Sequence, residues 1–485
     1  MTAAKAALES PINESPLLVD DVAMEPPKRV DLSAHQGLRG LLSLYVMIYH
    51  YFWYSTLQWE LHGSALMPPF FVLSGFSLAV GYGSKPLAPG SACCGEAADG
   101  DRALDWRAFY RNRAARILPT HYLMNAASVP LSFLGYGLVS KNALVSAGVL
   151  TAVCATTWFG PNFGSFCAPS WTISTLCGFY LVFPWVAPRL QRAAGSPPWY
   201  AILGLGMPAG CCRVPEPPAE ADATSLAVHM RLCFWAQLFS AAWSIGLGIA
   251  TGMVGPMATM WAVPRFPVFL AGAYAGLLAL RGGPVAVADA GLTARLYRCG
   301  TWASVADRSA FAVAFQLAAL SVVAITVTDV YAALWLQLTL PDTWVALVLG
   351  LALDDASRTY RMLTTPAMLF FGKISMTLYL VHLPVMQYFT FFLRGAQPNG
   401  WRGDVWATCV SDDYDDDEQE DCEDAMRRFS RRRLIPPWSI APLAVLSIVL
   451  AVALEKFFEA PRSGTRLSAS SWPSGSRISR NSSKA

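Results

Sequence analysis

The sequence predicts an all-α fold, a polytopic integral membrane helix bundle with about 10–12 transmembrane helices. Hydrophobic residues make up 54% of the 485 residues and charged residues only 14%, where about 25% is usual for a soluble domain. The mean hydropathy is +0.37. The net charge of +3 is too small for a nucleic-acid-binding protein, so we expect no nucleic-acid partner.

The second observation is the uneven placement of charge along the chain. Residues 117–188 contain one charged residue, Lys141, and residues 232–264 contain none. A helix needs about 20 apolar residues to cross the ~30 Å hydrocarbon core, so such stretches can each cross once or more. The predicted spans are 37–58, 63–83, 117–137, 142–158, 170–188, 232–256, 264–281, 309–328, 332–353, 374–393 and 436–455, with a weaker one at 195–212.

Polar segments divide the chain around these spans. Residues 1–35 form a polar segment without the apolar core of a signal peptide, and we expect it to be cytosolic. Residues 36–461 form the membrane domain, with a charged loop at 394–435. Residues 462–485, rich in Ser and Arg, are expected to be a flexible tail. The chain is thus predicted to be an integral multi-pass protein surrounded by membrane lipids.

The weaker span at 195–212 decides the topology. If it crosses, the basic loops 281–308 and 354–373 lie on the cytosolic side with 84–116, as the positive-inside rule favours. We therefore expect twelve membrane segments, or eleven and one re-entrant segment.

The eleven cysteines predict no metal site, because none has zinc-site spacing with histidines nearby. Most are interpreted as small apolar core residues. Lipidation of Cys93 and Cys94, or of Cys211 and Cys212, remains an alternative at these two pairs.

Ionisable residues inside predicted spans are the candidates for function, because their burial is costly. Arg39 and His50 are eleven residues apart in the first span, which places them on one helix face about 16 Å apart along the axis. Arg39 then lies at the cytosolic mouth and His50 near the midplane. His50 is either a hydrogen-bonded core histidine or a general base.

A second histidine, His382, lies nine residues after Lys373 and thus about 14 Å deep. Two histidines at one depth either face a common cavity or face different neighbours. Arg111, Arg113 and Arg116 cluster where another helix enters the membrane. Their guanidinium groups suit phosphate oxygens, and lipid headgroups are the alternative partner.

Several ordered motifs resemble the membrane acyltransferase-3 family, which includes bacterial O-antigen acetylases. The first is GLRGLLSLYVMIYH followed by MPPFFVLSGFSL, within residues 35–83. RAAR at 113–116 resembles the family's paired-arginine motif, and SWTISTLCGFYLVFP at 170–184 its fifth-span motif. RFPVFLAGAYAGLL, FGKISMTLYLVHLPV and Glu459-Ala460-Pro461 match later blocks. The resemblance covers most of residues 33–461.

This resemblance implies transfer of an acyl group, an acetyl group above all, from acyl-CoA to a hydroxyl, commonly on a carbohydrate. His50 would be the catalytic base, and no metal would take part. Arg39, Arg113 and Arg116 would bind the donor. The predicted substrate-binding residues are Trp171, Thr172, Tyr180, Tyr379 and His382.

One departure from the family pattern concerns the fifth span. The family has a glutamate four residues after a small hydroxyl residue, and here Thr172 is followed by Leu176. Two alternatives to an active O-acyltransferase therefore stay open, a catalytically diverged homologue and a multi-pass transporter or proton- or ion-coupled carrier.

Overall fold

The computed structural model describes residues 30–57, 61, 63–82, 106–134, 136, 143–158, 165–193, 219–250, 261–280, 304–323, 329–395 and 434–459. Twelve α-helices account for most of them, and no strand longer than a single bridge occurs among the described residues. The all-α fold is confirmed. The helices are α1 (Ser33–Trp53), α2 (Pro68–Tyr82), α3 (Trp106–Phe133), α4 (Leu144–Ala152), α5 (Trp171–Ala193), α7 (Ala219–Ala250), α9 (Phe266–Leu280), α12 (Val305–Val323), α13 (Asp329–Leu353), α14 (Arg358–Leu363), α15 (Pro366–Arg394) and α18 (Ile440–Glu459).

Each predicted span except one contains a helix of this bundle or overlaps with one. The exception is 195–212, which lies outside the described residues, as do 1–29, most of the loop 394–435, and 462–485. Five helical segments are long and apolar enough to cross a membrane by length and composition, and the chain is a multi-pass membrane protein. They are Ala168–Ala187, Val228–Ala250, Val263–Leu280, Pro366–Arg394 and Pro437–Phe458.

The span predicted at 142–158 needs correction. Its helix, α4, covers only Leu144–Ala152, and nine residues rise about 13 Å, less than half of the hydrocarbon core. The helix ends at Ala152, and Cys154 two residues later has a left-handed φ of 54°, which a right-handed helix does not contain. Apolar composition alone did not show this break.

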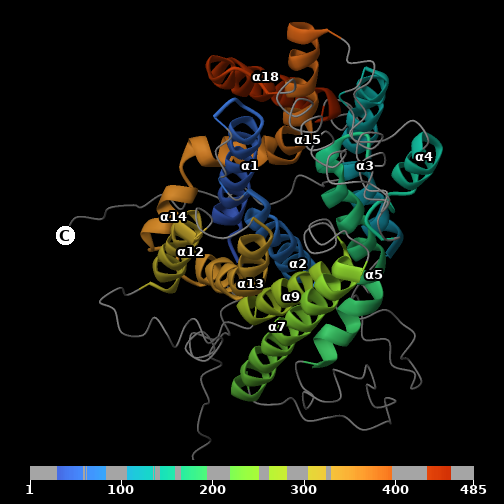
Figure 1. The fold of residues 1–485 in the computed structure, drawn as a ribbon. Coiled ribbons are helices and arrows are strands. Elements are labelled where there is room, and N and C mark those ends of the chain that lie inside the picture. Colours follow the sequence, from blue (N-terminus) through green and yellow to red (C-terminus); the bar gives the residue numbers. More distant parts are fainter. Residues whose placement is uncertain are drawn as a thin grey trace, which may run out of the picture.

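The most extensive helix contacts join α1 with α15 and α2 with α9, followed by α12 with α13, α7 with α9, and α15 with α18 (Figure 1). In the same view, α7 runs along α9, while α3, α4 and α5 lie together on one side and α12, α13 and α14 on the other. Residues far apart in sequence therefore meet along α1 and α15.

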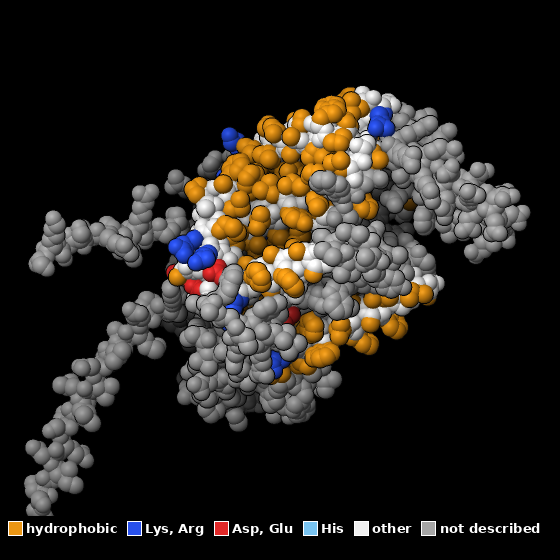
Figure 2. Space-filling model, turned by 60° about the vertical axis from the view of Figure 1, so that its left-hand side comes forward, with side chains coloured by type: hydrophobic (Ala, Val, Ile, Leu, Met, Phe, Trp, Pro, Cys, Tyr) orange, Lys and Arg blue, Asp and Glu red, His pale blue; other side chains and the backbone are white. Residues whose placement is uncertain are grey.

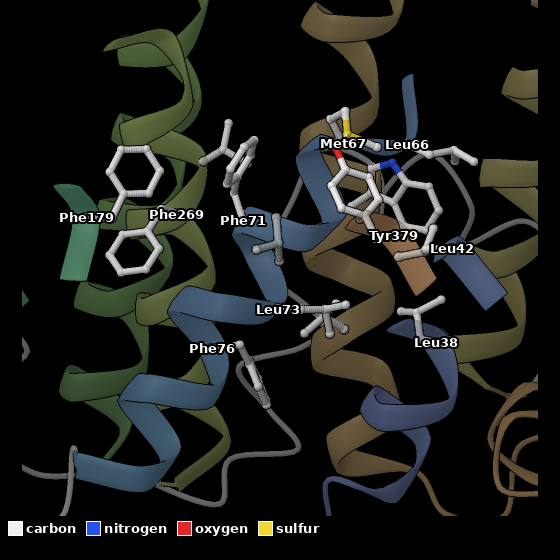
Figure 3. Packing of buried hydrophobic residues seen from close by; sticks show 14 of the residues in the cluster. Leu38, Leu42, Leu66, Met67, Phe71, Leu73, Phe76, Phe179, Phe269 and Tyr379 are labelled. Carbon is white, nitrogen blue, oxygen red and sulfur yellow. Dashed lines mark hydrogen bonds between the residues drawn. The ribbon is translucent and has the colours of Figure 1, made fainter. Parts of the chain in front are cut away.

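One large hydrophobic cluster runs through the described part of the bundle, and a small separate cluster lies around Ala147 and Phe166. Buried residues of α2 pack between the aromatic side chains of α5 and α9 and the side chains of α1 and α15 (Figure 3). The labelled residues in this view are Leu38, Leu42, Leu66, Met67, Phe71, Leu73, Phe76, Phe179, Phe269 and Tyr379. Outside, hydrophobic side chains cover much of the described surface (Figure 2), as expected for a protein whose solvent is lipid.

The short helix α14 is fixed by two carboxylates from other segments. Asp307 accepts hydrogen bonds from the backbone N–H groups of Arg358 and Thr359, and Asp31 accepts one from the hydroxyl of Tyr360. Burial raises the pKa of Asp31, but hydrogen bonds from Tyr360 and Ser33 outweigh it and hold the pKa below its ordinary value. These bonds join the start of α1 to α14, which directly precedes α15.

Glycine sets the spacing between α1 and α15. A Cβ atom on Gly40 would lie 2.5 Å from the backbone nitrogen of Gly372, and one on Gly372 would lie 2.2 Å from the backbone oxygen of Gln36. Both distances are far below van der Waals contact, and both obstacles are backbone atoms that no rotamer change can move. The two helices can therefore pack this closely only with glycine at these positions.

We predict that Gly372→Ala lowers the stability of the folded protein by about 1–3 kcal/mol, because the new methyl group overpacks this crossing. Thermal unfolding of the purified protein in detergent, followed by tryptophan fluorescence, measures the loss. Gly81→Ala is the control, because nothing lies within 4 Å of a Cβ atom there. Equal stability of the two variants would contradict the packing argument.

Candidate active site

The centre of the candidate site is a pair of histidines from different ends of the chain. His50 on α1 and His382 on α15 lie 3.0 Å apart, from Nδ1 of His50 to Nε2 of His382. His382 is fully buried and His50 is partly exposed. The structure thus brings the two histidines together, which decides between the two arrangements that their depth left open.

Backbone carbonyl groups orient both imidazole rings. Nδ1 of His382 lies 3.2 Å from the carbonyl oxygen of Leu378, and Nδ1 of His50 lies 2.9 Å from that of Val46. A carbonyl oxygen only accepts hydrogen bonds, so each Nδ1 carries a hydrogen when its ring is neutral. The single hydrogen on Nδ1 of His50 is then shared between two acceptors, the carbonyl oxygen of Val46 and Nε2 of His382. Nε2 of His50 keeps a lone pair, with no hydrogen-bond partner among the described residues.

Tyr51 fixes the backbone of α15 next to the histidine pair. Its hydroxyl donates to the carbonyl oxygen of His382 over 3.1 Å and lies 2.6 Å from the hydroxyl of Ser447 on α18. Tyr51 directly follows His50 in sequence. The α15 backbone at His382 is therefore tied to α1 and α18 at the level of the imidazoles.

Tyr379 and Thr172 lie beside the histidine pair. The ring centroid of Tyr379 is 6.0 Å from that of His382. Its hydroxyl donates to the sulfur of Met67 over 3.4 Å (Figure 3), and the hydroxyl of Thr172 donates to the carbonyl oxygen of Pro169 over 3.0 Å. The start of α5 and the segment before α2 therefore supply polar groups to the same place.

Three arginines form a second group near the beginning of α1. Arg39 lies on α1, and Arg113 and Arg116 lie on α3. The guanidinium group of Arg39 interacts electrostatically with Arg116, Tyr180 and Arg113. Tyr180 in turn donates a hydrogen bond to the hydroxyl of Ser74 on α2 over 3.4 Å. Arg39 and His50 share one helix, so this group lies about 16 Å along the axis from the histidine pair.

This arginine group has the character of an anion site. Three guanidinium groups repel one another unless an anion or water offsets their charge. Nε of Arg113 is buried and has no hydrogen-bond partner among the described residues. An unsatisfied buried donor of this kind is costly unless a ligand satisfies it. A phosphate group has the charge and the oxygen atoms to do so.

Trp171 and Leu176 on α5 lie outside these two groups. Trp171 is buried, with its ring 6.3 Å from that of Phe71. It adjoins Thr172 in sequence, but its indole shows no contact with either histidine in the described part of the chain. Leu176, at the position of the family's glutamate, is partly buried and packs against the main hydrophobic cluster.

Sequence reasoning missed Asn125, which fixes the chain just before α5. Its Oδ1 accepts hydrogen bonds from the backbone N–H of Cys167 (3.1 Å) and the hydroxyl of Ser170 (3.3 Å). Its Nδ2 donates to the carbonyl oxygen of His121 over 2.9 Å. The signal was present as a polar stripe at helical spacing in an apolar segment, namely His121, Asn125, Ser128 and Ser132, all buried.

Comparison with protein families gives one match that covers nearly the whole chain. The family model described as an acyltransferase domain, acyltransferase-3, matches residues 33–456. No curated protein and no solved structure matches significantly. The match includes both histidines and all three arginines of the candidate site.

We predict that Asn125→Leu lowers the stability by about 2–3 kcal/mol, because it leaves the Cys167 N–H and the Ser170 hydroxyl buried without their acceptor. The change should also lower enzymatic activity, since Trp171 and Thr172 directly follow this segment. Thermal unfolding in detergent and any activity of the purified protein measure the two effects. Ala126→Leu, on the exposed face one residue later, should leave both unchanged. An Asn125→Leu protein as stable as this control would show that the network contributes nothing.

Proposed function

As a member of the acyltransferase-3 family this chain is a membrane acyltransferase, and we propose that it transfers an acyl group from acyl-CoA to a hydroxyl group of its acceptor. The acyl group that we propose is acetyl, and the acceptor a carbohydrate or a lipid-like molecule. The observation that carries this proposal is the 3.0 Å contact between His50 and His382. His50 lies on α1, the helix that also carries Arg39.

His50 is the proposed general base. Nε2 of His50 takes the proton of the acceptor hydroxyl while that oxygen attacks the thioester carbonyl. His50 then returns the proton to the departing CoA sulfur, so that the products are the acyl ester and CoA with a free thiol. The transfer needs no covalent acyl-enzyme, because His50 serves both the nucleophilic oxygen and the leaving sulfur in one place.

His382 is the proposed partner of this base. Its Nε2 shares the Nδ1–H of His50 with the carbonyl oxygen of Val46, and the two acceptors hold the His50 ring with its Nε2 lone pair outward. When His50 gains the second proton, the same bond spreads the positive charge over two rings. The buried pair thus stabilises an imidazolium that a lone buried histidine would stabilise poorly.

The arginine group is the proposed binding site for the CoA phosphates. Arg113 and Arg116 would hold phosphate oxygens, and Arg39 would lie between them and the entrance to the site along α1. This assignment places the arginines on the cytosolic side, where acyl-CoA is available, in agreement with the expected cytosolic N-terminus. The separation of about 16 Å requires a donor with its charge at one end and its reactive group at the other.

The acceptor is proposed to bind beside Tyr379 and Thr172, within reach of the histidines. The family's glutamate is Leu176 here, which can neither accept a hydrogen bond nor carry charge. The hydroxyl groups of Tyr379 and Thr172 then supply the polar contacts, while Tyr180 lies with the arginine group. We expect an acceptor less polar than those of relatives that keep the acid.

We predict that His50→Ala and His50→Gln abolish acyl transfer, because neither side chain can accept a proton at neutral pH. His382→Gln should lower kcat by about 10- to 100-fold and leave a measurable rate, since the base itself remains. Release of the CoA thiol from acetyl-CoA measures the rate, with water or a panel of sugar and glycerol acceptors. His229→Gln on α7 is the control, because that histidine packs on Tyr274 outside the site. Full activity in His50→Gln would refute the assignment.

We predict that Arg113→Ala combined with Arg116→Ala raises the apparent KM for acetyl-CoA about tenfold or more, with a smaller effect on kcat. Added salt should weaken donor binding by the native protein and have less effect on the double variant, because screening acts on the contacts that were removed. Arg111→Ala is the matched control, an exposed arginine on the same helix that is not among the groups interacting with Arg39. If KM and its salt dependence stay unchanged in the double variant, the two arginines do not bind the donor.

A further inference from the structure

Helix α15 lacks one of its own hydrogen bonds at the turn that carries His382. Pro384 lies inside this helix and has no backbone N–H, so the carbonyl group of Leu380 loses the helical partner that it would have four residues later. The proline ring also pushes this carbonyl away from its helical position. His382 lies midway between Leu380 and Pro384, so its imidazole is carried by the weakened turn.

The thiol of Cys167 supplies a donor to this carbonyl. Cys167 lies in the segment before α5, and its Sγ donates a hydrogen bond to the carbonyl oxygen of Leu380 over 3.4 Å. The side chain of Cys167 is fully buried. A thiol is a weak donor, but a buried carbonyl without any partner costs about 1–3 kcal/mol. The contact therefore satisfies a group that the proline in α15 leaves without its helical bond.

The backbone around Cys167 is fixed on both sides. Its N–H donates to Oδ1 of Asn125 on α3 over 3.1 Å, and its carbonyl oxygen accepts a hydrogen bond from the N–H of Ser170 over 2.9 Å. Asn125 is itself oriented, because its Nδ2 donates to the carbonyl oxygen of His121 over 2.9 Å. The thiol is thus held by α3 and by the beginning of α5, and it connects both to α15.

A second hydrogen bond reaches the same turn of α15 from another helix. The hydroxyl of Tyr51 on α1 donates to the carbonyl oxygen of His382 over 3.1 Å, and the hydroxyl of Ser447 on α18 lies 2.6 Å from that of Tyr51. Because Tyr51 has one hydroxyl hydrogen and gives it to His382, Ser447 donates to Tyr51. The turn with the missing helical bond is therefore supported from outside at two carbonyl groups, those of Leu380 and His382.

We propose that Cys167 is a positioning residue for His382. Its thiol holds the turn that Pro384 weakens, and this support keeps Nε2 of His382 at 3.0 Å from Nδ1 of His50. The thiol takes no part in the chemistry and stays a thiol throughout. On the proposed function, losing it slows acyl transfer, because the partner of the base is then less well oriented.

The test compares Cys167→Ala with Cys167→Ser in the full-length protein purified in detergent. Alanine removes the donor, whereas serine keeps a hydroxyl group that can donate to the same carbonyl. We expect Cys167→Ala to lower kcat with acetyl-CoA about tenfold and to change KM by less than about twofold, because the proposed phosphate site is elsewhere. Cys167→Ser should keep about half of the native kcat or more. Cys233→Ala is the control, because it makes the same change at another buried cysteine, on α7.

A double-mutant cycle with Pro384→Ala separates this role from general packing. Alanine restores the N–H of residue 384 and lets the Leu380 carbonyl return to its helical bond, so the thiol is no longer needed. In that background Cys167→Ala should lower kcat by less than about twofold. Equal losses in the two backgrounds would overturn the proposal. A Cys167→Ala protein with the native kcat, or a Cys167→Ser protein as slow as Cys167→Ala, would do the same.

Infrared spectroscopy of the S–H stretch follows the hydrogen bond itself and requires no enzymatic activity. A hydrogen bond lowers the frequency of this stretch, and the difference spectrum between the native protein and Cys167→Ala isolates the Cys167 band. We expect a band below that of a free thiol, and a shift back toward the free value in Pro384→Ala. A native band at the free-thiol frequency would overturn the proposal. If the native protein releases no CoA with any acceptor tested while its S–H band is lowered, the proposed function fails and the thiol bond to α15 stands.

Discussion

The close crossing of α1 and α15 is the constraint on which the rest of the site depends. Gly40 and Gly372 let the two backbones meet, and the amide of Gln36 donates to the carbonyl oxygen of Leu369 over 3.1 Å at the same level. About ten residues further along each helix, His50 and His382 meet. Because both helices are rigid, a change in spacing at the glycines changes the separation of the imidazoles. A small backbone feature thus sets the distance between the two histidines of the candidate site.

The second constraint is the number of polar groups that an apolar bundle must bury. Water is absent from the hydrocarbon core, so each polar group needs a partner within the protein. Many hydroxyl groups satisfy themselves locally by donating to the carbonyl four residues earlier, as Ser43, Ser128, Thr175 and Thr390 do. Such groups are not available to a ligand. The groups that bond across helices, at Asn125, Tyr51 and Tyr379, are the ones that shape the site.

The sequence predicted the helices far better than their contacts. Charge-free stretches located the spans, and helical periodicity placed Arg39 and His50 on one face. The depth of His382 in the membrane stays a prediction from counting residues. Its contact with His50 could not be predicted, since 332 residues separate them and no local pattern encodes which helices become neighbours. The same holds for the hydrogen bond from the Ser174 hydroxyl to the carbonyl oxygen of Cys154, because the left-handed residue Cys154 lies in a segment that reads as a continuous span.

The arginine group and the histidine pair lie about 16 Å apart along α1, and this separation is the feature that most limits which acyl donor the proposed site could use. A small anion such as free acetate would be held at the arginines, too far from His50 to react. A neutral acyl donor would gain nothing from three guanidinium groups whose mutual repulsion must be offset. A donor with phosphates at one end and a thioester on a long uncharged arm uses both groups at once. On the proposed function, binding energy gained at the phosphates then serves to hold the thioester at the histidine pair, which is where orientation contributes most to the rate.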